Sequence, residues 1–365
     1  MFSIQQDKEI FQVKFNNNDD YEIITGTGEI LQDTKYNSTK AKNWQEYKAN
    51  SLKIAELIEQ SPTLILDNVK LERLKHCADT LLFANLEDGS KRLRQAYFCK
   101  NRICPMCQWR RSLKMYNNVD EITREMLKQE PKTRFIFLTL TIRNCKKENL
   151  VDSINLLNNA FTTLIKPPRR KAPIILKKFV DNSYLGYYKA LEITYSRMNK
   201  DYHPHLHCII AVKPNYFGYY YISYAKWQEC WKFALNENSK EEIDYYPEID
   251  IKAIKTNFSN DKLQHKTIAE VAKYPLKSVS ILKIKNKAEA ISVLDTFIKV
   301  LYNRRFISMG GIFKVMKQQL LKKEVDDIEG NNVDLIHIGN DVDKTLNIVS
   351  YTMYKYDKKF GLYIC

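Results

Sequence analysis

Alternation of apolar and polar residues predicts three β-strands in the middle of the chain. RFIFLTLTIRN (134–144), GYYKALEITYS (186–196) and HPHLHCIIAV (203–212) all follow the two-residue period of a strand. We expect the last two to form an antiparallel hairpin centred near residues 199–200. The two faces of the first strand are Ile136, Leu138, Leu140 and Ile142, and Phe135, Phe137, Thr139 and Thr141.

Helix and loop signals surround these strands. Residues 41–60, 268–279 and 290–305 have helical patterns, KPPRRKAP (166–173) predicts a loop, and MGG (309–311) predicts a turn. Strands mixed with helices predict an α+β fold. We expect four regions. Residues 1–70 have no assigned role, residues 71–115 form a cysteine-rich module, residues 130–285 form a central domain with the three strands, and residues 286–365 form a mainly helical C-terminal region.

Charge indicates a polyanionic partner. The 365 residues include 58 Lys and Arg against 43 Asp and Glu, which gives a net charge of +15. Phosphates neutralised by such a surplus release their counterions, which favours binding to nucleic acid. Membrane surfaces are anionic too, but no apolar run approaches the ~20 residues of a membrane span. The first residues also lack a signal-peptide pattern, so we expect a cytoplasmic protein without a membrane partner.

Four cysteines have the spacing of a structural zinc site. Cys99, Cys104 and Cys107 lie within CKNRICPMC, where the last two are close enough to share one tetrahedral ion. A fourth ligand is needed, and Cys77 is preferred over its neighbour His76 because all-thiolate sites are common. The alternative is a set of free or buried thiols in a reducing compartment.

Basic residues gather around these cysteines. Residues 91–114 contain eight Lys and Arg and no acidic residue, which is typical of a DNA-binding surface. Arg102, Arg110 and Arg111 are the candidate DNA contacts. A solvated basic face would have the same composition and remains the alternative.

Histidines on the third strand suggest a second metal site. His203, His205 and His207 share one face, and imidazoles at positions i and i+2 can bind one divalent ion. In the expected hairpin, Glu192 lies opposite His207 and Thr194 lies opposite His205. Two histidines and one carboxylate leave coordination positions open and suit Mn²⁺ or Mg²⁺. The alternative for Glu192 is an ordinary carboxylate on the solvent side of its strand.

One tyrosine stands out through its neighbours. In IAEVAKYPLKSV (268–279), Glu270 and Tyr274 are four residues apart and share a helix face, and Lys273 and Lys277 flank the tyrosine. We expect Tyr274 to act as a nucleophile, Lys277 to stabilise the tyrosinate or a phosphate, and Lys273 to contact DNA. A packed tyrosine is the alternative, since the chain has 23 tyrosines.

These segments together resemble the rolling-circle replication initiators of small Gram-positive plasmids, which belong to the HUH endonuclease superfamily. FLTLT (137–141), HPHLHCII (203–210) and AEVAKYPLKS (269–278) are similar to the three motifs of that family, in the same order. CPMCQWRRS (104–112) and MGGIFK (309–314) are similar to family members as well.

The resemblance implies an antiparallel sheet with packed helices, preceded by a small zinc-binding module. It implies that His205 and His207 bind the catalytic metal, and that Tyr274 attacks the DNA to leave a 5′-phosphotyrosine and a free 3′-OH primer. Glu270 occupies the position of a glutamate that promotes attack by water at termination. The implied partners are plasmid origin DNA, both duplex and single-stranded, a host helicase and a host DNA polymerase, and a second copy of the chain on DNA.

Other functions fit the same residues. A conjugative relaxase or a single-strand transposase would use the same chemistry in another setting. A non-catalytic zinc-dependent DNA-binding repressor would use the cysteine module alone, and His205, His207 and Tyr274 would then be packing residues. A hydrolytic metallonuclease would use water as its nucleophile and would tolerate Tyr274→Phe.

Overall fold

The computed structural model describes most of the chain in two compact units. The first unit comprises Met1–Arg111, Ser278–Asp295 and Asp334–Cys365, and the second comprises Ser112–Lys277 and Thr296–Val333. Each unit thus combines segments that are far apart along the chain, whereas the sequence suggested consecutive regions. The described residues are 14–15, 21–22, 44–62, 66–87, 91–254, 256–257, 262–263, 268, 271–272, 278–320, 335–336, 338 and 348–365.

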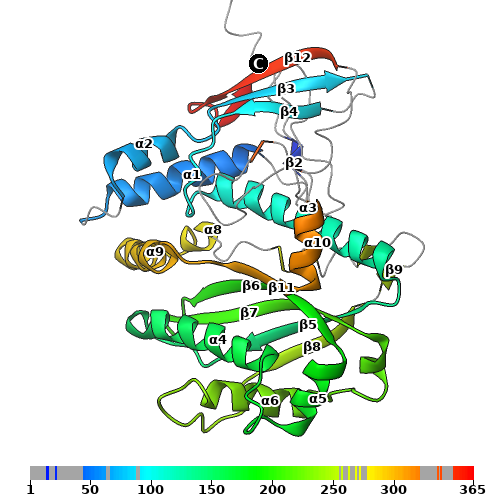
Figure 1. The fold of residues 1–365 in the computed structure, drawn as a ribbon. Helices are drawn as coiled ribbons and strands as arrows, with labels where there is room; N and C mark the ends of the chain where they lie inside the picture. The colour runs from blue at the N-terminus through cyan, green and yellow to red at the C-terminus, as the bar shows by residue number, and fades with distance from the viewer. Residues whose placement is uncertain are drawn as a thin grey trace, which may run out of the picture. The chain divides into compact units, whose positions relative to one another are not determined.

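A five-stranded antiparallel sheet forms the centre of the second unit (Figure 1). Its order is β11 (Ile307–Gly311), β6 (Tyr184–Ser196), β7 (Asp201–Val212), β5 (Arg134–Thr141) and β8 (Ile249–Ile254). The three strands predicted from alternation are β5, β6 and β7, and they lie side by side. The histidine strand β7 is therefore the central strand of the sheet.

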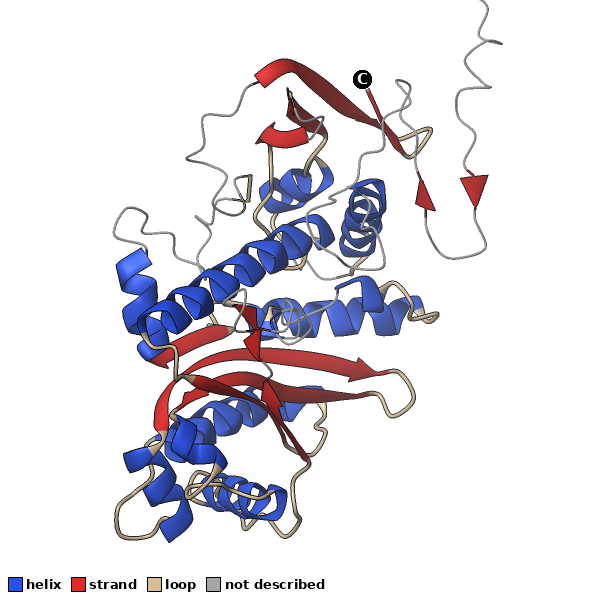
Figure 2. Ribbon diagram, turned by 90° about the vertical axis from the view of Figure 1, so that its right-hand side faces the viewer, coloured by secondary structure: helices blue, strands red, loops and turns tan. Residues whose placement is uncertain are grey.

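Helices pack on both faces of this sheet. On one face lie α4 (Leu150–Ile165), α5 (Ile174–Asn182) and α6 (Tyr224–Asn236), and Figure 2 shows these helices beneath the twisted strands. On the other face lies α10 (Ile312–Leu320), whose Phe313 ring is 6.4 Å from the ring of Phe135. The predicted core residues of β7 face the α4 side and are buried, as expected: Leu206, Cys208 and Ile210.

The pairing register of β6 and β7 differs by two residues from the prediction. The structure pairs Glu192 with His205 and Thr194 with His203, so each partner is two residues earlier than expected. Asp201 and Tyr202 already belong to β7, which leaves a four-residue turn at 197–200 with Lys200 in the left-handed region at φ 50°. Because side chains alternate with a period of two, this shift keeps every residue on its predicted face.

The first unit contains a four-stranded antiparallel sheet. Its order is β13 (Leu362–Ile364), β12 (Ile348–Asp357), β3 (Thr80–Leu86) and β4 (Lys91–Ala96). The mainly helical region expected from residue 286 onwards therefore also contains β11, β12 and β13. Burial alternates at the end of β12, where Tyr354 and Tyr356 are buried and Met353 and Lys355 are exposed.

Helices complete the first unit. These are α1 (Trp44–Glu59), which confirms the helix expected at residues 41–60, α2 (Asn68–Lys75) and α8 (Ser278–Ile281). Two further helices, α3 (Pro105–Gln129) and α9 (Lys287–Leu301), begin in the first unit and continue into the second. The remaining elements are short: β1 (Lys14–Phe15), β2 (Tyr21–Glu22), η1 (Lys147–Asn149), η2 (Pro214–Phe217), β9 (Thr256–Asn257) and β10 (Lys262–Leu263).

The glycine pair at 310–311 lies in a strand and not in the predicted turn. Gly310 and Gly311 pair with β6, and the chain turns into α10 only at Gly311, which has φ 59°. The two strands approach so closely that a Cβ on Gly186 would lie 2.6 Å from the carbonyl oxygen of Gly310. A Cβ on Gly310 would lie 2.5 Å from the ring of Tyr187. Glycine is therefore required on both strands by packing.

We expect Gly186→Ala to destabilise the protein by about 1–3 kcal/mol, because the added methyl group meets main-chain atoms that cannot move aside. Thermal unfolding measures this effect. Gly218→Ala is the matched control, since its Cβ would have no neighbour closer than 4.0 Å. Equal melting temperatures for the two variants would contradict the close approach of β6 and β11.

Candidate functional site: two clusters of metal-ligating side chains

The first cluster joins one carboxylate and two imidazoles. Glu192 on β6 points toward His205 and His207 on β7, and a single oxygen, Oε2, lies 2.9 Å from Nε2 of His207 and 3.3 Å from Nε2 of His205. All three residues are buried, with exposed fractions of 6%, 8% and 6%. The predicted carboxylate and histidine pair therefore meet, although Glu192 is the cross-strand partner of His205 and not of His207.

Neighbouring groups hold both imidazole rings in place. Nδ1 of His207 lies 3.2 Å from Oγ1 of Thr139, its partner on β5, and the ring of Phe137 stacks on the imidazole. Nδ1 of His205 lies 3.2 Å from the main-chain oxygen of His203. Partners at Nδ1 leave both Nε2 atoms directed at one point, which is how metal-binding histidines are usually oriented.

The electrostatics favour an ionised Glu192. Burial opposes ionisation of this carboxyl, but hydrogen bonds from His205 and His207 outweigh it, so the pKa of Glu192 lies well below its usual range.

Nothing in the sequence alone gave a role to Thr139. The register with β7 would have been the only signal, because it places Thr139 beside His207.

The geometry of this cluster fits a divalent cation. Its three ligand atoms all lie within 4.8 Å of one another. Adjacent ligands of an octahedral ion with bonds of about 2.1 Å are roughly 3.0 Å apart, which agrees with the two distances from Glu192. One carboxylate and two imidazoles also suit Mn²⁺ or Mg²⁺ with open positions for a phosphate oxygen and water.

His203 is outside this cluster. Its Nδ1 lies 2.7 Å from Oδ1 of Asn144 in the loop that follows β5. Burial, together with the nearby His205, lowers the pKa of His203. His203 is therefore not among the side chains whose ligand atoms converge with that of Glu192.

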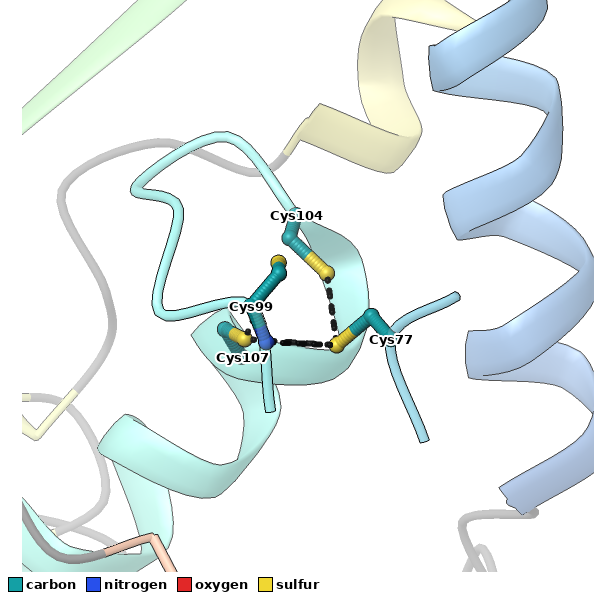
Figure 3. A group of neighbouring side chains, drawn as sticks. All are labelled: Cys77, Cys99, Cys104 and Cys107. Carbon is teal, nitrogen blue, oxygen red and sulfur yellow. Dashed lines mark hydrogen bonds between the residues drawn. The ribbon is translucent and has the colours of Figure 1, made fainter. Parts of the chain in front are cut away.

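The second cluster consists of Cys77, Cys99, Cys104 and Cys107, whose thiols point toward one another (Figure 3). The sulfur of Cys107 lies 3.6 Å from those of Cys77 and Cys99, and the sulfurs of Cys104 and Cys77 are also 3.6 Å apart. Four sulfurs bound at about 2.3 Å to one tetrahedral zinc ion lie roughly 3.8 Å apart. The cluster therefore fits zinc.

Short local structures bring these cysteines together. Cys77 follows the end of α2, Cys99 follows β4, and Cys104 and Cys107 lie at the start of α3. Burial raises the pKa of the Cys77 thiol, so a bound cation would be needed to keep this sulfur ionised. His76, the alternative ligand, instead has Nδ1 2.7 Å from Oδ2 of Asp79 and is largely exposed.

The basic residues beside the cysteines are partly structural, which corrects one expectation. Arg110 donates to the main-chain oxygens of Leu335 and Ile336 at 2.9 and 3.1 Å, and Arg111 donates to that of Asn101 at 3.1 Å. Their exposed fractions are only 4% and 6%. Both guanidinium groups are bound to carbonyls inside the unit, so neither is presented to DNA. Arg102 is half-buried and keeps its place as a candidate DNA contact.

The tyrosine motif lies outside the described residues. This applies to all four of its singled-out positions: Glu270, Lys273, Tyr274 and Lys277. Of the same segment, Ile268, Val271, Ala272, Ser278 and Val279 are described, and all but the half-buried Val279 are buried.

Comparison with known proteins defines the family. The replication protein family (Rep_1) matches residues 90–364. The chain is 35% identical over 308 residues to a protein named "Protein rep" from Streptococcus pneumoniae serotype 2, covering 84% of this chain and 86% of the relative. It is 34% identical over 331 residues to "Protein rep" of Lentilactobacillus hilgardii, covering 90% and 96%. No solved structure matches the chain.

The chain therefore belongs to the replication protein family. The resemblance to the rolling-circle replication initiators of Gram-positive plasmids, inferred from the motifs, is confirmed. Among the described residues, no helix has the length and hydropathy that a membrane crossing requires.

Replacement of Cys104 by serine should remove bound zinc, because a buried hydroxyl is a poor substitute for a thiolate ligand. We expect about one equivalent of zinc in the wild type and close to none in Cys104→Ser, together with a loss of stability of several kcal/mol. Metal analysis and thermal unfolding measure both. Cys145→Ser, outside the cluster, should keep its zinc. A wild-type protein purified without zinc would contradict the site.

Replacement of Glu192 by glutamine should weaken Mn²⁺ binding by at least about tenfold, because the only anionic ligand of the first cluster is lost. Isothermal titration with MnCl₂ measures the dissociation constant. Glu229→Gln is the control, since Glu229 is an exposed glutamate paired with Lys226 on α6. Unchanged affinity in Glu192→Gln would rule out this carboxylate as a ligand.

Proposed function

We propose that this replication initiator is a site-specific endonuclease and strand transferase that nicks one strand of the plasmid origin. The observation that carries this proposal is the meeting of Glu192, His205 and His207 on one face of the central strands, in a member of the replication protein family. A histidine pair on the central strand of an antiparallel sheet also supports an HUH-like nicking domain.

Tyr274 is the proposed nucleophile. A phenol has a pKa near 10, so its oxygen needs help to attack phosphorus at neutral pH. Mn²⁺ or Mg²⁺ held by Glu192, His205 and His207 would polarise the scissile phosphate and offset charge on the departing oxygen. The Tyr274 oxygen bonds to phosphorus as its proton leaves, the bond to the 3′ oxygen breaks, and that oxygen takes up a proton.

The products follow from this exchange of one phosphodiester for another. The 5′ end remains linked to Tyr274 as a phosphotyrosine, and the free 3′-OH serves as a primer for a host DNA polymerase. Lys277 would stabilise the tyrosinate or the phosphate. At termination, Glu270 would act as the base that removes a proton from water, because a second transfer is then required.

The remaining contacts are proposed from charge. The zinc module, with Arg102 exposed in part, and Lys273 near the nucleophile would bind the DNA backbone of the origin. The scissile strand enters unpaired, so a host helicase must continue the unwinding after the nick. We further infer that the protein acts in the cytoplasm, where plasmid DNA is copied, and that a second copy can join it on the origin.

The first experiment mixes the full chain with Mn²⁺ and an end-labelled single strand from the origin. We expect a protein–DNA band that resists SDS for the wild type and none for Tyr274→Phe, because the phenylalanine ring has no oxygen to attack phosphorus. Tyr219→Phe is the control, since Tyr219 is 82% exposed and outside the motif.

Other outcomes identify other mechanisms. Cleavage that persists in Tyr274→Phe without a covalent band would indicate water as the nucleophile. If the wild type neither cuts nor binds covalently to a verified origin strand, the catalytic proposal fails and a DNA-binding repressor becomes the better description.

A further inference from the structure

A basic pocket lies on the opposite face of the five-stranded sheet from the Glu192 cluster. Its volume is about 320 Å³, within the range of roughly 300–1,000 Å³ of small-molecule sites. Lys189 lines it, and the register shows why the two sites differ in face: Lys189 pairs with Cys208, whereas the next residue, Ala190, pairs with His207. The pocket is therefore separate from the proposed nicking centre.

The lining of this pocket is cationic. Lys189, Arg304 and Arg305 contribute positive charge, and no Asp or Glu is among the nine residues that surround the cavity. Ser308 adds a hydroxyl group from β11, where it is the cross-strand partner of Lys189 and so shares its face. Three cations beside a hydroxyl group and without a carboxylate match the chemistry of a phosphate group.

Lys189 is the most informative of these residues. Only 7% of it is exposed, and among the described residues its ammonium group has no carboxylate partner. Its Nζ donates to Oδ1 of Asn158 on α4 at 2.7 Å and lies 4.6 Å from the ring centre of Phe161. Burial lowers the pKa of Lys189 to about 8, so it remains largely protonated at neutral pH. A buried cation is costly without an anion, and a bound phosphate would offset that cost.

An exposed aromatic ring lies beside the cationic lining of the pocket. Asn303 has a φ of 51°, in the left-handed region. It is the last residue of the turn after α9 and lines the cavity. Tyr302 lies beside it and is 74% exposed. An exposed aromatic ring next to a phosphate site is the arrangement that binds a nucleotide through both its base and its phosphate.

We propose that this pocket binds a nucleotide, with its phosphate held by Lys189 and Arg305 and its base on Tyr302. Arg304 adds positive charge beside them while its guanidinium donates to the Val300 main-chain oxygen and to Oδ1 of Asn155. The phosphate ester can belong to a free mononucleotide or to one residue of a single DNA strand. Binding in this pocket is independent of the nicking chemistry of Tyr274, because the pocket uses other residues on the opposite face of the sheet from Glu192.

The test titrates the full-length protein, without added Mn²⁺, with three probes: inorganic phosphate, dAMP and a single-stranded thymidine decamer. We expect Lys189→Met to weaken binding of the recognised probe at least about tenfold and Arg305→Gln to weaken it several-fold. Tyr302→Ala should weaken the binding of dAMP but not the binding of inorganic phosphate. Arg170→Gln and Tyr219→Ala are exposed controls that should bind like the wild type.

The probes decide the source of the phosphate. Binding of dAMP that depends on Lys189 and Arg305 establishes a free nucleotide, and binding of the decamer alone with the same dependence establishes a DNA strand. Absence of binding, or affinities that these variants leave unchanged, overturns the proposal. If Lys189→Met does not fold, the exposed positions Arg305 and Tyr302 still decide the result. Glu229→Gln, at an exposed glutamate on α6 outside both sites, should bind all three probes like the wild type.

Discussion

The pairing register of β6 and β7 is the constraint on which the candidate site depends. Glu192 reaches both imidazoles only because it is the cross-strand partner of His205, and His207 is two residues further along β7 on the same face. A slip by one residue would place the carboxylate on the α4 face, among apolar side chains and away from both rings. The register is held by buried residues on that face and by the close contact of Gly186 with β11.

Local periodicity was sufficient to predict the site's components but not its exact partners. Alternation identified β5, β6 and β7 and the face of each histidine, because these depend only on neighbouring residues. The pairing of Glu192 depended on whether Asp201 and Tyr202 extend the strand, which is decided by the turn and by tertiary contacts. In the same way, Gly310 resembled a turn residue in the sequence, although close packing against Tyr187 is what requires it.

Charge was the least reliable guide to position. The basic run beside the cysteines suggested a DNA surface, yet Arg110 and Arg111 bind main-chain carbonyls and stabilise the interior of their unit. The spacing of the cysteines, in contrast, predicted a four-cysteine cluster, and the structure brings Cys77 together with Cys99, Cys104 and Cys107. Ligand spacing constrains geometry directly, whereas the environment of an arginine depends on segments as distant as Leu335 that composition does not reveal.

The pairing of β3 with β12 has a consequence for how the protein folds during translation. Asn85 on β3 donates to Ser350 on β12 at 2.8 Å across a separation of 265 residues. All four cysteines of the cluster precede residue 108, so they leave the ribosome long before β12 does. During that interval, the edge of β3 that pairs with β12 has no partner strand. Metal binding at the cysteines would order the segment around them early in synthesis. The four-stranded sheet, in contrast, is complete only after β12 has been synthesised.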